Sequence, residues 1–185
     1  MYTKVEEAIH FMVKAYKGQK RKNENIDASF HSMIVGMMIR NITYSEDVIV
    51  AAILHDIIND SNYGYEEIEE MFGTLVADIV YDLSENMSIP KWLYRKRDFL
   101  NRIKKNYDLN VINIMIADKI QNLVSDYNLF LEVGDKVWKS SGGSKDENMW
   151  LYRESYYIAK EKGADQGLLD RYKKLLIIYF GDVDE

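Results

Sequence analysis

The sequence predicts an all-α fold in which the helices pack as a bundle. The chain has a single proline in 185 residues, at position 90, so little in it interrupts helices. No segment shows the alternation of apolar and polar residues that indicates a half-buried strand. Helix-starting and helix-ending residues recur instead at spacings typical of helices. With 47% hydrophobic residues, the chain is expected to bury one core, as a single domain covering residues 1–185.

The first helices are predicted from capping residues and apolar runs. Thr3–Glu6 has the capping-box pattern, which opens a helix that Gly18 can end. An apolar segment around His31 predicts a second helix, largely surrounded by core. Ser45, followed by two acidic residues, begins a third helix, which the apolar pattern continues to Asp60.

The middle of the chain predicts three further helices. Residues 65–72 form a short helix that Gly73 ends, and Thr74 is expected to cap the helix that follows. Pro90 suits the first turn of a basic helix that continues toward Asn106, because proline is favoured at the start of helices.

The last third of the chain is expected to be helical apart from one loop. Residues 109–133 predict one long helix. Six glycines and serines within residues 134–146 predict a flexible loop. Helices over residues 147–162 and 165–180 complete the predicted bundle.

A candidate metal site lies where the third helix becomes polar. Residues 51–60 are apolar up to His55 and Asp56, with Asn59 and Asp60 one turn further on. Side chains four residues apart share one helix face, so Asn59 is expected over His55 and Asp60 over Asp56. An imidazole beside a carboxylate can reach one divalent ion. For an isolated His–Asp pair, a helix end with scattered polar groups would be the better interpretation.

Two more polar residues lie within apolar segments. His31 has apolar neighbours on both sides, and Asp118 follows an uninterrupted apolar run. Each alone is more often a satisfied polar group of the core, because an unpaired buried carboxylate costs several kcal/mol. Together with His55 and Asp56 they supply two imidazoles and two carboxylates. This set suits Mn, Fe, Zn or Ni better than Ca, and we expect one Mn²⁺-type ion.

Five ordered segments of the chain carry a family pattern. They are Gly18–Lys22, His55–Asp60, Phe72–Val80, Pro90–Arg97 and Ala117–Leu123. The order of the histidines and aspartates resembles the HD-domain metallophosphohydrolases. The five segments are similar to motifs of the (p)ppGpp hydrolase domain of RelA/SpoT proteins and of the small alarmone hydrolases. The motif-bearing core covers about residues 5–125, and the predicted helices over about 147–180 follow it.

The resemblance implies a fold, a reaction and a set of roles. The fold is an HD-domain helical bundle, and the reaction removes the 3′ pyrophosphate from the guanosine alarmone ppGpp. The implied metal ligands are His31, His55, Asp56 and Asp118. Asp60 would orient the attacking water or accept its proton.

The resemblance also implies contacts to the base and the ribose of the nucleotide. Arg21 would stack on the guanine and Lys22 would help to hold the nucleotide. Without the resemblance, the basic run that contains them is better read as a solvated loop. Asn122, four residues after Asp118 on the same predicted face, would contact the ribose or its 3′ phosphate.

Two further groups are candidates for contacts to the substrate. Lys91 and Arg95 are expected on one side of the basic helix, where they would bind the pyrophosphate. An exposed basic face is the alternative. The resemblance makes Tyr152 or Trp150 a candidate for closing over the nucleotide. Both are more often core aromatics in such a segment.

Three positions depart from the family pattern. Asn59 stands where the family has a glutamate that assists the attacking water, and an amide cannot accept a proton at neutral pH. Asn59 would then position the water by hydrogen bonds only. Tyr16 stands where a histidine is often found, and Met87 where a lysine is often found.

Composition excludes several classes of protein and partner. The net charge of −6 argues against broad nucleic-acid binding, although basic residues cluster at 17–22 and 91–105. The absence of cysteine excludes disulfides and a thiolate nucleophile. The first residues lack a signal-peptide pattern, and no apolar run approaches the length of a membrane span, so we expect a cytoplasmic protein.

Three questions stay open at the level of sequence. The substrate is expected to be a small nucleotide: ppGpp first, with the 2′ phosphate of NADPH or a nucleoside 5′-monophosphate as alternatives. A different class of protein is also possible on the sequence: a nucleotide-binding sensor that lost catalysis when the glutamate became Asn59. The aromatic-rich C-terminal helices suit a monomer or a homodimer.

Overall fold

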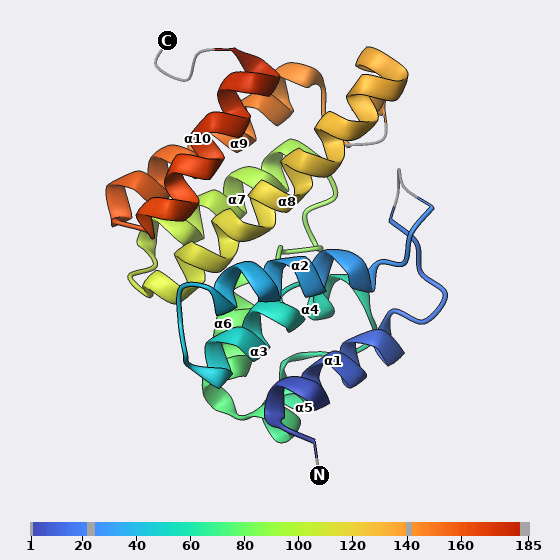
Figure 1. Ribbon diagram of the computed structural model, residues 1–185, viewed down its shortest axis with the longest axis vertical. Coiled ribbons are helices and arrows are strands. Elements are labelled where there is room, and N and C mark those ends of the chain that lie inside the picture. The colour runs from blue at the N-terminus through green and yellow to red at the C-terminus, as the bar shows by residue number, and fades with distance from the viewer. Residues whose placement is uncertain (1, 22–24, 140–141, 182–185) are drawn as a thin grey trace. The chain divides into compact units, whose positions relative to one another are not determined.

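The computed structural model describes residues 2–21, 25–139 and 142–181. These residues form helices and one isolated β-bridge, between Lys20 and Asp27, with no strand among them. The all-α prediction is therefore confirmed (Figure 1). The described residues divide into two compact units, which we call the N-terminal unit (residues 2–21 and 25–85) and the C-terminal unit (residues 86–139 and 142–181). The single-domain expectation stays a prediction.

The N-terminal unit is built around one apolar helix. Its elements are α1 (Lys4–Ala15), α2 (Ser29–Arg40), α3 (Glu46–Leu54), α4 (Ile57–Asp60), α5 (Tyr65–Phe72) and α6 (Thr74–Leu83). Helix α3 packs against α1, α2 and α6, and every residue from Val48 to Leu54 is buried. This explains the uninterrupted apolar run before His55, because a helix covered on all sides has no polar face.

The capping predictions in this unit have mixed outcomes. The capping box of Thr3 is present, and the Ser45 hydroxyl accepts a hydrogen bond from the backbone of Val48. The prediction that Thr74 caps α6 is wrong. The capping position is Gly73, whose φ of +87° favours glycine, and the Thr74 hydroxyl instead donates to Glu69 Oε1 at 2.9 Å.

The helix predicted from Ser45 to Asp60 is interrupted at the His–Asp pair. Helix α3 ends at Leu54, and α4 begins at Ile57, so His55 and Asp56 form a turn between two helices. The backbone N–H of Asn59 donates to the carbonyl of Asp56, three residues before it, at 3.1 Å. The N–H of Asp60 donates to the same carbonyl at 2.9 Å, so regular helical bonding resumes one turn after Asp56.

A glycine lets α2 and α3 approach closely. A Cβ atom on Gly36 would lie 2.6 Å from Cγ1 of Ile53, which is closer than any side chain tolerates without movement. Gly36 follows His31 on α2, and Ile53 lies near the end of α3, just before His55. The contact therefore sets the spacing of the two helices that lead to the histidines.

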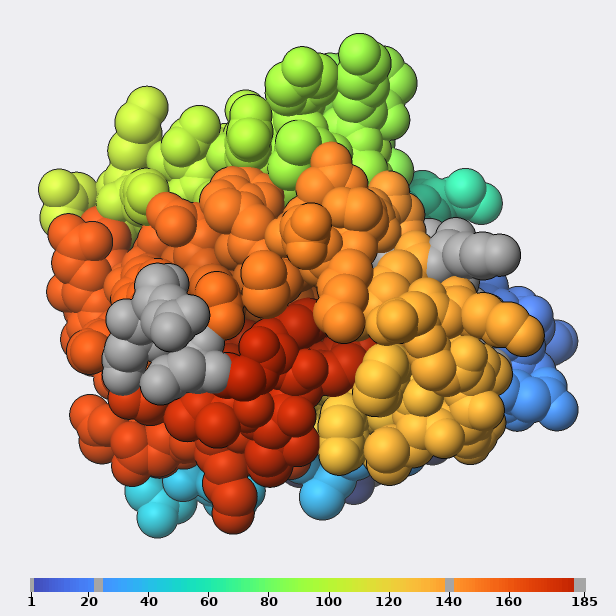
Figure 2. Space-filling view, turned by 90° about the horizontal axis from the view of Figure 1, so that it is seen from above, coloured from blue at the N-terminus to red at the C-terminus, as the bar shows by residue number. Residues whose placement is uncertain are grey.

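The C-terminal unit is built around the long helix. Its elements are α7 (Trp92–Lys105), α8 (Leu109–Val133), the 3₁₀ helix η1 (Gly134–Lys139), α9 (Lys145–Lys162) and α10 (Gln166–Phe180). The prediction of one helix over residues 109–133 is confirmed. Helix α8 packs against η1, α9 and α10, and α7 packs against α9. Figure 2 looks onto this unit, with α9 in orange beside α10 in red.

The segment predicted as a flexible loop is largely structured. Residues 134–139 form η1, in which Val137 and Trp138 are buried, and the Trp138 ring stacks on Tyr179 at 5.3 Å between centroids. Gly142 and Gly143 lie against Trp92, where a Cβ on either would meet its ring at 2.7 Å. The glycines here serve close packing with an aromatic ring. Residues 140 and 141 lie outside the described residues.

Candidate metal centre

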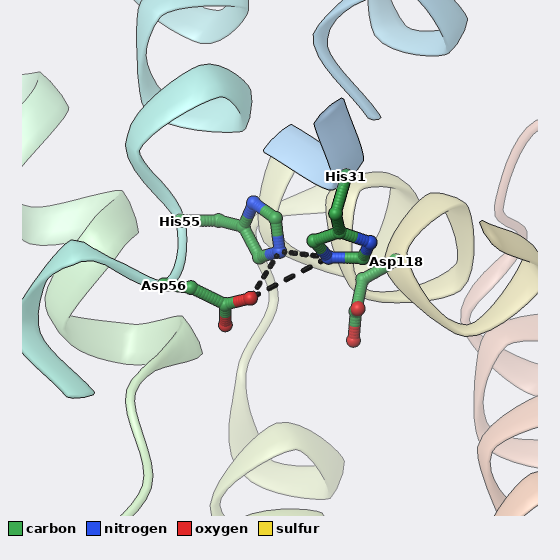
Figure 3. A group of neighbouring side chains, drawn as sticks. All are labelled: His31, His55, Asp56 and Asp118. Carbon is green, nitrogen blue, oxygen red and sulfur yellow. Dashed lines mark hydrogen bonds and ion pairs between the residues drawn. The ribbon is translucent and has the colours of Figure 1, made fainter. Parts of the chain in front are cut away.

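Three predicted ligands of the N-terminal unit converge on one point. The Nε2 atoms of His31 and His55 lie 3.1 Å apart, and Oδ2 of Asp56 lies 3.1 Å from the His55 nitrogen and 3.4 Å from the His31 nitrogen. Figure 3 shows both imidazole rings and the Asp56 carboxylate pointing toward one another. The structure thus brings together residues from α2 and from the turn between α3 and α4.

The turn after α3 explains how two adjacent residues face the same point. Neighbouring side chains on a regular helix point about 100° apart around the axis. Here His55 keeps helical backbone angles, whereas Asp56 departs from them at φ −100° and ψ −1°, and the polar atoms of the two side chains lie 3.1 Å apart. His31 and His55 are almost fully buried, whereas the Asp56 side chain is 34% exposed, which leaves the cluster open on the aspartate side.

The tautomer of His55 suits a metal ligand. Its Nδ1 atom lies 2.8 Å from the backbone carbonyl of Ala52, one turn earlier on α3. The carbonyl can only accept a hydrogen bond, so Nδ1 carries the proton and the lone pair of Nε2 faces the cluster. A hydrogen bond from the second nitrogen to a carbonyl is the usual way in which a metal-binding histidine is oriented.

The spacing of the three atoms fits one divalent ion. Metal–nitrogen and metal–oxygen bonds of about 2.0–2.2 Å place ligand atoms of one ion roughly 3.0–3.5 Å apart. The observed separations of 3.1 and 3.4 Å fall in this range. His31, His55 and Asp56 therefore belong to a His/Asp group that could hold a metal ion, and their nitrogen and oxygen atoms suit a first-row transition metal.

Asp118 lies on α8 in the C-terminal unit, where its own helix holds both carboxylate oxygens. Lys119 Nζ donates to Oδ2 at 2.7 Å, and Asn122 Nδ2 donates to Oδ1 at 2.5 Å. The residue is only 9% exposed. The predicted shared face of Asp118 and Asn122 is thus confirmed. Lys119, whose role the sequence did not indicate, supplies the cation that a buried carboxylate needs.

Asn59 and Asp60 differ in their surroundings. The amide of Asn59 is engaged with the backbone of Glu85, since Nδ2 donates to the Glu85 carbonyl at 3.0 Å and Oδ1 accepts from its N–H at 2.8 Å. Asp60 is exposed, and its backbone carbonyl accepts a hydrogen bond from Gln19 at 3.0 Å. The amide is thus committed to holding α4 against the end of α6.

The comparison with protein families decides the classification. A model of the HD domain matches residues 8–128, which is more than half of the chain and includes all four predicted metal ligands. The chain belongs to the HD domain family.

Several relatives of this HD domain carry one name. A guanosine-3′,5′-bis(diphosphate) 3′-pyrophosphohydrolase, MESH1 of Drosophila melanogaster, is 31% identical over 78 residues, which is 42% of this chain and 42% of the relative. MESH1 of Danio rerio is 28% identical over 120 residues, 63% of this chain and 66% of the relative. A Spiroplasma citri enzyme of the same name is 26% identical, over 66% of this chain and 18% of its own length. The chain therefore matches less than two thirds of the length of these relatives.

Solved structures share the fold of this HD domain. One, described as a metazoan ortholog of SpoT that hydrolyses ppGpp and plays a role in starvation responses, superposes with a TM-score of 0.78 at 20% identity over 98% of both chains. A protein of Listeria monocytogenes EGD-e has a TM-score of 0.71 at 27% identity, covering 81% of this chain and 98% of its own. Because the metazoan structure is only 20% identical in sequence, its likeness to this chain establishes the fold alone.

Arg21 and Lys22, which are predicted to bind the guanine nucleotide, lie shortly before the predicted metal ligand His31 in the sequence. Arg21 is half-buried, and its backbone N–H donates to the carbonyl of Ile26 at 3.1 Å. The adjacent Lys20 pairs with Asp27 through its side chain at 2.7 Å. These contacts fold the segment before α2 back on itself. Lys22 lies outside the described residues.

The basic residues at the start of α7 have defined surroundings. Lys91 is exposed at the N-cap, with its ammonium 5.5 Å from the centroid of the Tyr94 ring. Arg95 Nη1 donates to the carbonyl of Ile89 at 3.0 Å. Both residues lie at the N-terminal end of one helix of the C-terminal unit. Their contact with pyrophosphate stays a prediction.

Tyr152 is a core residue of the C-terminal unit. It is 5% exposed, its hydroxyl donates to Asp126 Oδ2 at 2.9 Å, and its carbonyl accepts from the Tyr172 hydroxyl at 3.0 Å. Burial, together with the charge of Asp126, raises the pKa of the Tyr152 phenol well above its usual value. These contacts favour the core alternative.

No described helix combines the length and apolar character that a bilayer span requires.

Proposed function

We propose that this HD domain is a metal-dependent hydrolase that removes the 3′ pyrophosphate from ppGpp. The observation that carries the proposal is the convergence of His31, His55 and Asp56 at 3.1–3.4 Å within an HD framework. The relatives named as guanosine-3′,5′-bis(diphosphate) 3′-pyrophosphohydrolases support the choice of substrate. The order of the five sequence motifs along the chain agrees with that choice.

The proposed cofactor is one Mn²⁺ ion, and Asp118 is its fourth ligand. The donor set of two imidazoles and two carboxylates suits Mn²⁺ and also admits Zn, Fe or Ni. Asp118 has the family's position in the chain, after an apolar run and before Lys119 and Asn122. The hydrogen bonds from those two side chains orient its carboxylate, as groups around a metal ligand commonly do.

We assign Asp60 to the attacking water, and Arg21 and Asn122 to the nucleotide. When bound, a divalent ion polarises a phosphoryl oxygen and lowers the pKa of bound water toward ~7 in favourable cases. Asp60, an exposed carboxylate one turn beyond Asp56, accepts the proton of the attacking water. Arg21 holds the guanine side of the substrate, and Asn122 the ribose side.

The binding of the leaving group is assigned to basic residues. Lys91 and Arg95 lie at the N-terminus of α7, where both their charges and the helix dipole favour an anion. We propose that they hold the pyrophosphate. Lys22 would assist in holding the nucleotide.

A turnover panel with Mn²⁺ tests the substrate. ppGpp, NADPH and the nucleoside monophosphates are each assayed, with pyrophosphate and phosphate measured separately. We expect pyrophosphate from ppGpp alone. Release of phosphate from NADPH or a monophosphate would move the assignment to that substrate, and nucleotide binding without any turnover would make the protein a sensor.

Metal content tests the ligands. We expect about one transition-metal ion in the wild type and its loss in His55→Ala and Asp118→Ala, measured by elemental analysis. The control is His10→Ala, which removes an exposed histidine on α1 and leaves the cluster intact. Retention of the metal in both site variants would contradict the ligand set. Retention in Asp118→Ala alone would remove only the proposed fourth ligand.

A further inference from the structure

Tyr16 carries a buried hydroxyl that has no hydrogen-bond partner among the described residues. The residue caps the C-terminus of α1 and is 4% exposed. Buried polar groups are nearly always hydrogen-bonded, and leaving one unpaired costs free energy, so this hydroxyl calls for a partner outside the protein.

Two carboxylates of the turn after α3 and of α4 act on the Tyr16 phenol. Burial raises the pKa of the Tyr16 phenol far above its usual value, and the nearby carboxylates of Asp56 and Asp60 raise it further. The hydroxyl of Ser32, which follows His31, lowers the pKa but does not complete a hydrogen bond with Tyr16. A phenol keeps its proton at neutral pH, so the Tyr16 hydroxyl can donate a hydrogen bond.

The backbone holds Tyr16 in this place. The N–H of Gln19 donates to the Tyr16 carbonyl at 2.9 Å, and the Gln19 side chain donates to the Asp60 carbonyl at 3.0 Å. The end of α1 is thus fastened to the end of α4. Asn59 stands where the family pattern has a glutamate that assists the attacking water. Its amide is instead hydrogen-bonded to the backbone of Glu85.

We propose that Tyr16 is a water-positioning residue, whose hydroxyl donates a hydrogen bond to a water molecule held beside Asp56 and Asp60 at the metal centre. Such a water accepts from the phenol and donates to a carboxylate, so all three groups are satisfied. The role rests on the proposed function, because the positioned water is the one that attacks the substrate. Tyr16 takes over the orienting role for which the Asn59 amide is no longer free.

Spectroscopy tests the contact without depending on turnover. We expect addition of Mn²⁺ to the wild type to perturb the near-ultraviolet absorption of a tyrosine, and the perturbation to be absent in Tyr16→Phe. The matched control is Tyr65→Phe, which removes a hydroxyl bonded to Asp78 at 2.8 Å elsewhere in the same unit. Tyr65→Phe should keep the perturbation. If Tyr16→Phe shows the wild-type perturbation while binding Mn²⁺ equally well, the proposal is wrong.

Kinetics test the role in the reaction. Loss of one hydrogen bond to the attacking water is expected to lower kcat about tenfold in Tyr16→Phe while KM and Mn²⁺ content stay near wild type. Tyr16→His, which restores a donor, should recover part of the loss and also covers the case in which Tyr16→Phe folds poorly. An unchanged kcat in Tyr16→Phe would overturn the role. If wild type does not hydrolyse ppGpp, the proposed function fails while the spectral result still decides whether Tyr16 faces the centre.

Discussion

At the scale of single residues, Asn59 has both ends of its amide occupied. Its donor and its acceptor pair with the carbonyl and the N–H of Glu85, 26 residues further along the chain. Only an amide provides both groups at this length, since a carboxylate accepts but does not donate. The residue that replaces the family glutamate therefore gives α4 a fixed attachment to the end of α6.

Replacing this amide is expected to cost stability. Asn59→Asp keeps the shape of the side chain but replaces the donor toward the Glu85 carbonyl by a second acceptor, which removes that hydrogen bond and sets two acceptor oxygens against each other. We expect the free energy of unfolding to fall by about 1–3 kcal/mol, measured by urea denaturation. Asn62→Asp, at an exposed position nearby, controls for the added charge. Equal stability of the two variants would show that the attachment contributes nothing.

The same residue shows what sequence reasoning reaches and what it misses. His31, His55 and Asp56 were predictable because polar groups within apolar runs indicate a buried site. The partner of Asn59 was not predictable, because Glu85 is distant in the chain and contributes only its backbone. Tyr16 was visible only as a departure from a family pattern. Nothing in its neighbours indicates a buried hydroxyl without a partner.

At the scale of elements, the close packing of α2 and α3 controls the distance between the histidines. At Gly36 an added Cβ atom would lie 2.6 Å from Cγ1 of Ile53. His31 precedes Gly36 on α2, and His55 follows the end of α3. Any side chain at Gly36 must separate the two helices or displace Ile53. Either movement changes the 3.1 Å separation of the two imidazole nitrogens.

Gly36→Ala is therefore expected to weaken the metal site as well as the fold. The added methyl would meet Ile53 Cγ1 at 2.6 Å, so we expect a loss of about 1–3 kcal/mol in stability together with a weaker affinity for Mn²⁺. Calorimetric titration with Mn²⁺ and urea denaturation measure the two effects. Ile53→Ala removes the opposing atom, so the double variant should bind Mn²⁺ more tightly than Gly36→Ala alone. Additive effects would mean that the two positions do not compete for space.

Helix positions were largely predictable from sequence, and the exceptions share a cause. The helix over residues 109–133 and the start of α1 follow from apolar periodicity and local capping. The interruption at His55 and the 3₁₀ helix η1 were missed, because the first lies inside an apolar pattern and the second among glycines and serines. In η1 the order comes from tertiary packing of Trp138 against Tyr179, which local sequence does not display.

At the scale of the whole molecule, buried tyrosines tie stability to alkaline pH. The chain has fourteen tyrosines. Burial raises the pKa of Tyr16 in the N-terminal unit and of Tyr152 and Tyr172 in the C-terminal unit above the ordinary value of 10.0. The folded chain thus keeps these protons where the unfolded chain releases them. The contribution of these retained protons to the free energy of unfolding is fully present below pH 10 and is lost as the pH rises above it.

Tyr172→Phe is expected to flatten this alkaline loss. Above pH 10, each phenol that is protonated only in the folded state lowers stability by about 1.4 kcal/mol per pH unit, and the variant has one fewer. It also loses the hydrogen bond to the Tyr152 carbonyl, worth about 1 kcal/mol at neutral pH. Urea denaturation on both sides of pH 10 measures the two slopes. Parallel slopes for wild type and variant would contradict the raised pKa of Tyr172.

The nearness in sequence of His31, His55 and Asp56 has a consequence for unfolding. The two histidines are 24 residues apart, so an ion bound to both closes a short loop, and the entropy of closing it amounts to about 3 kcal/mol beyond a constant term. Ligand binding slows only those openings that separate the ligands. A bound ion would therefore protect the amide protons of α2 and α3 against hydrogen exchange, while fraying at the start of α1 would continue unaffected.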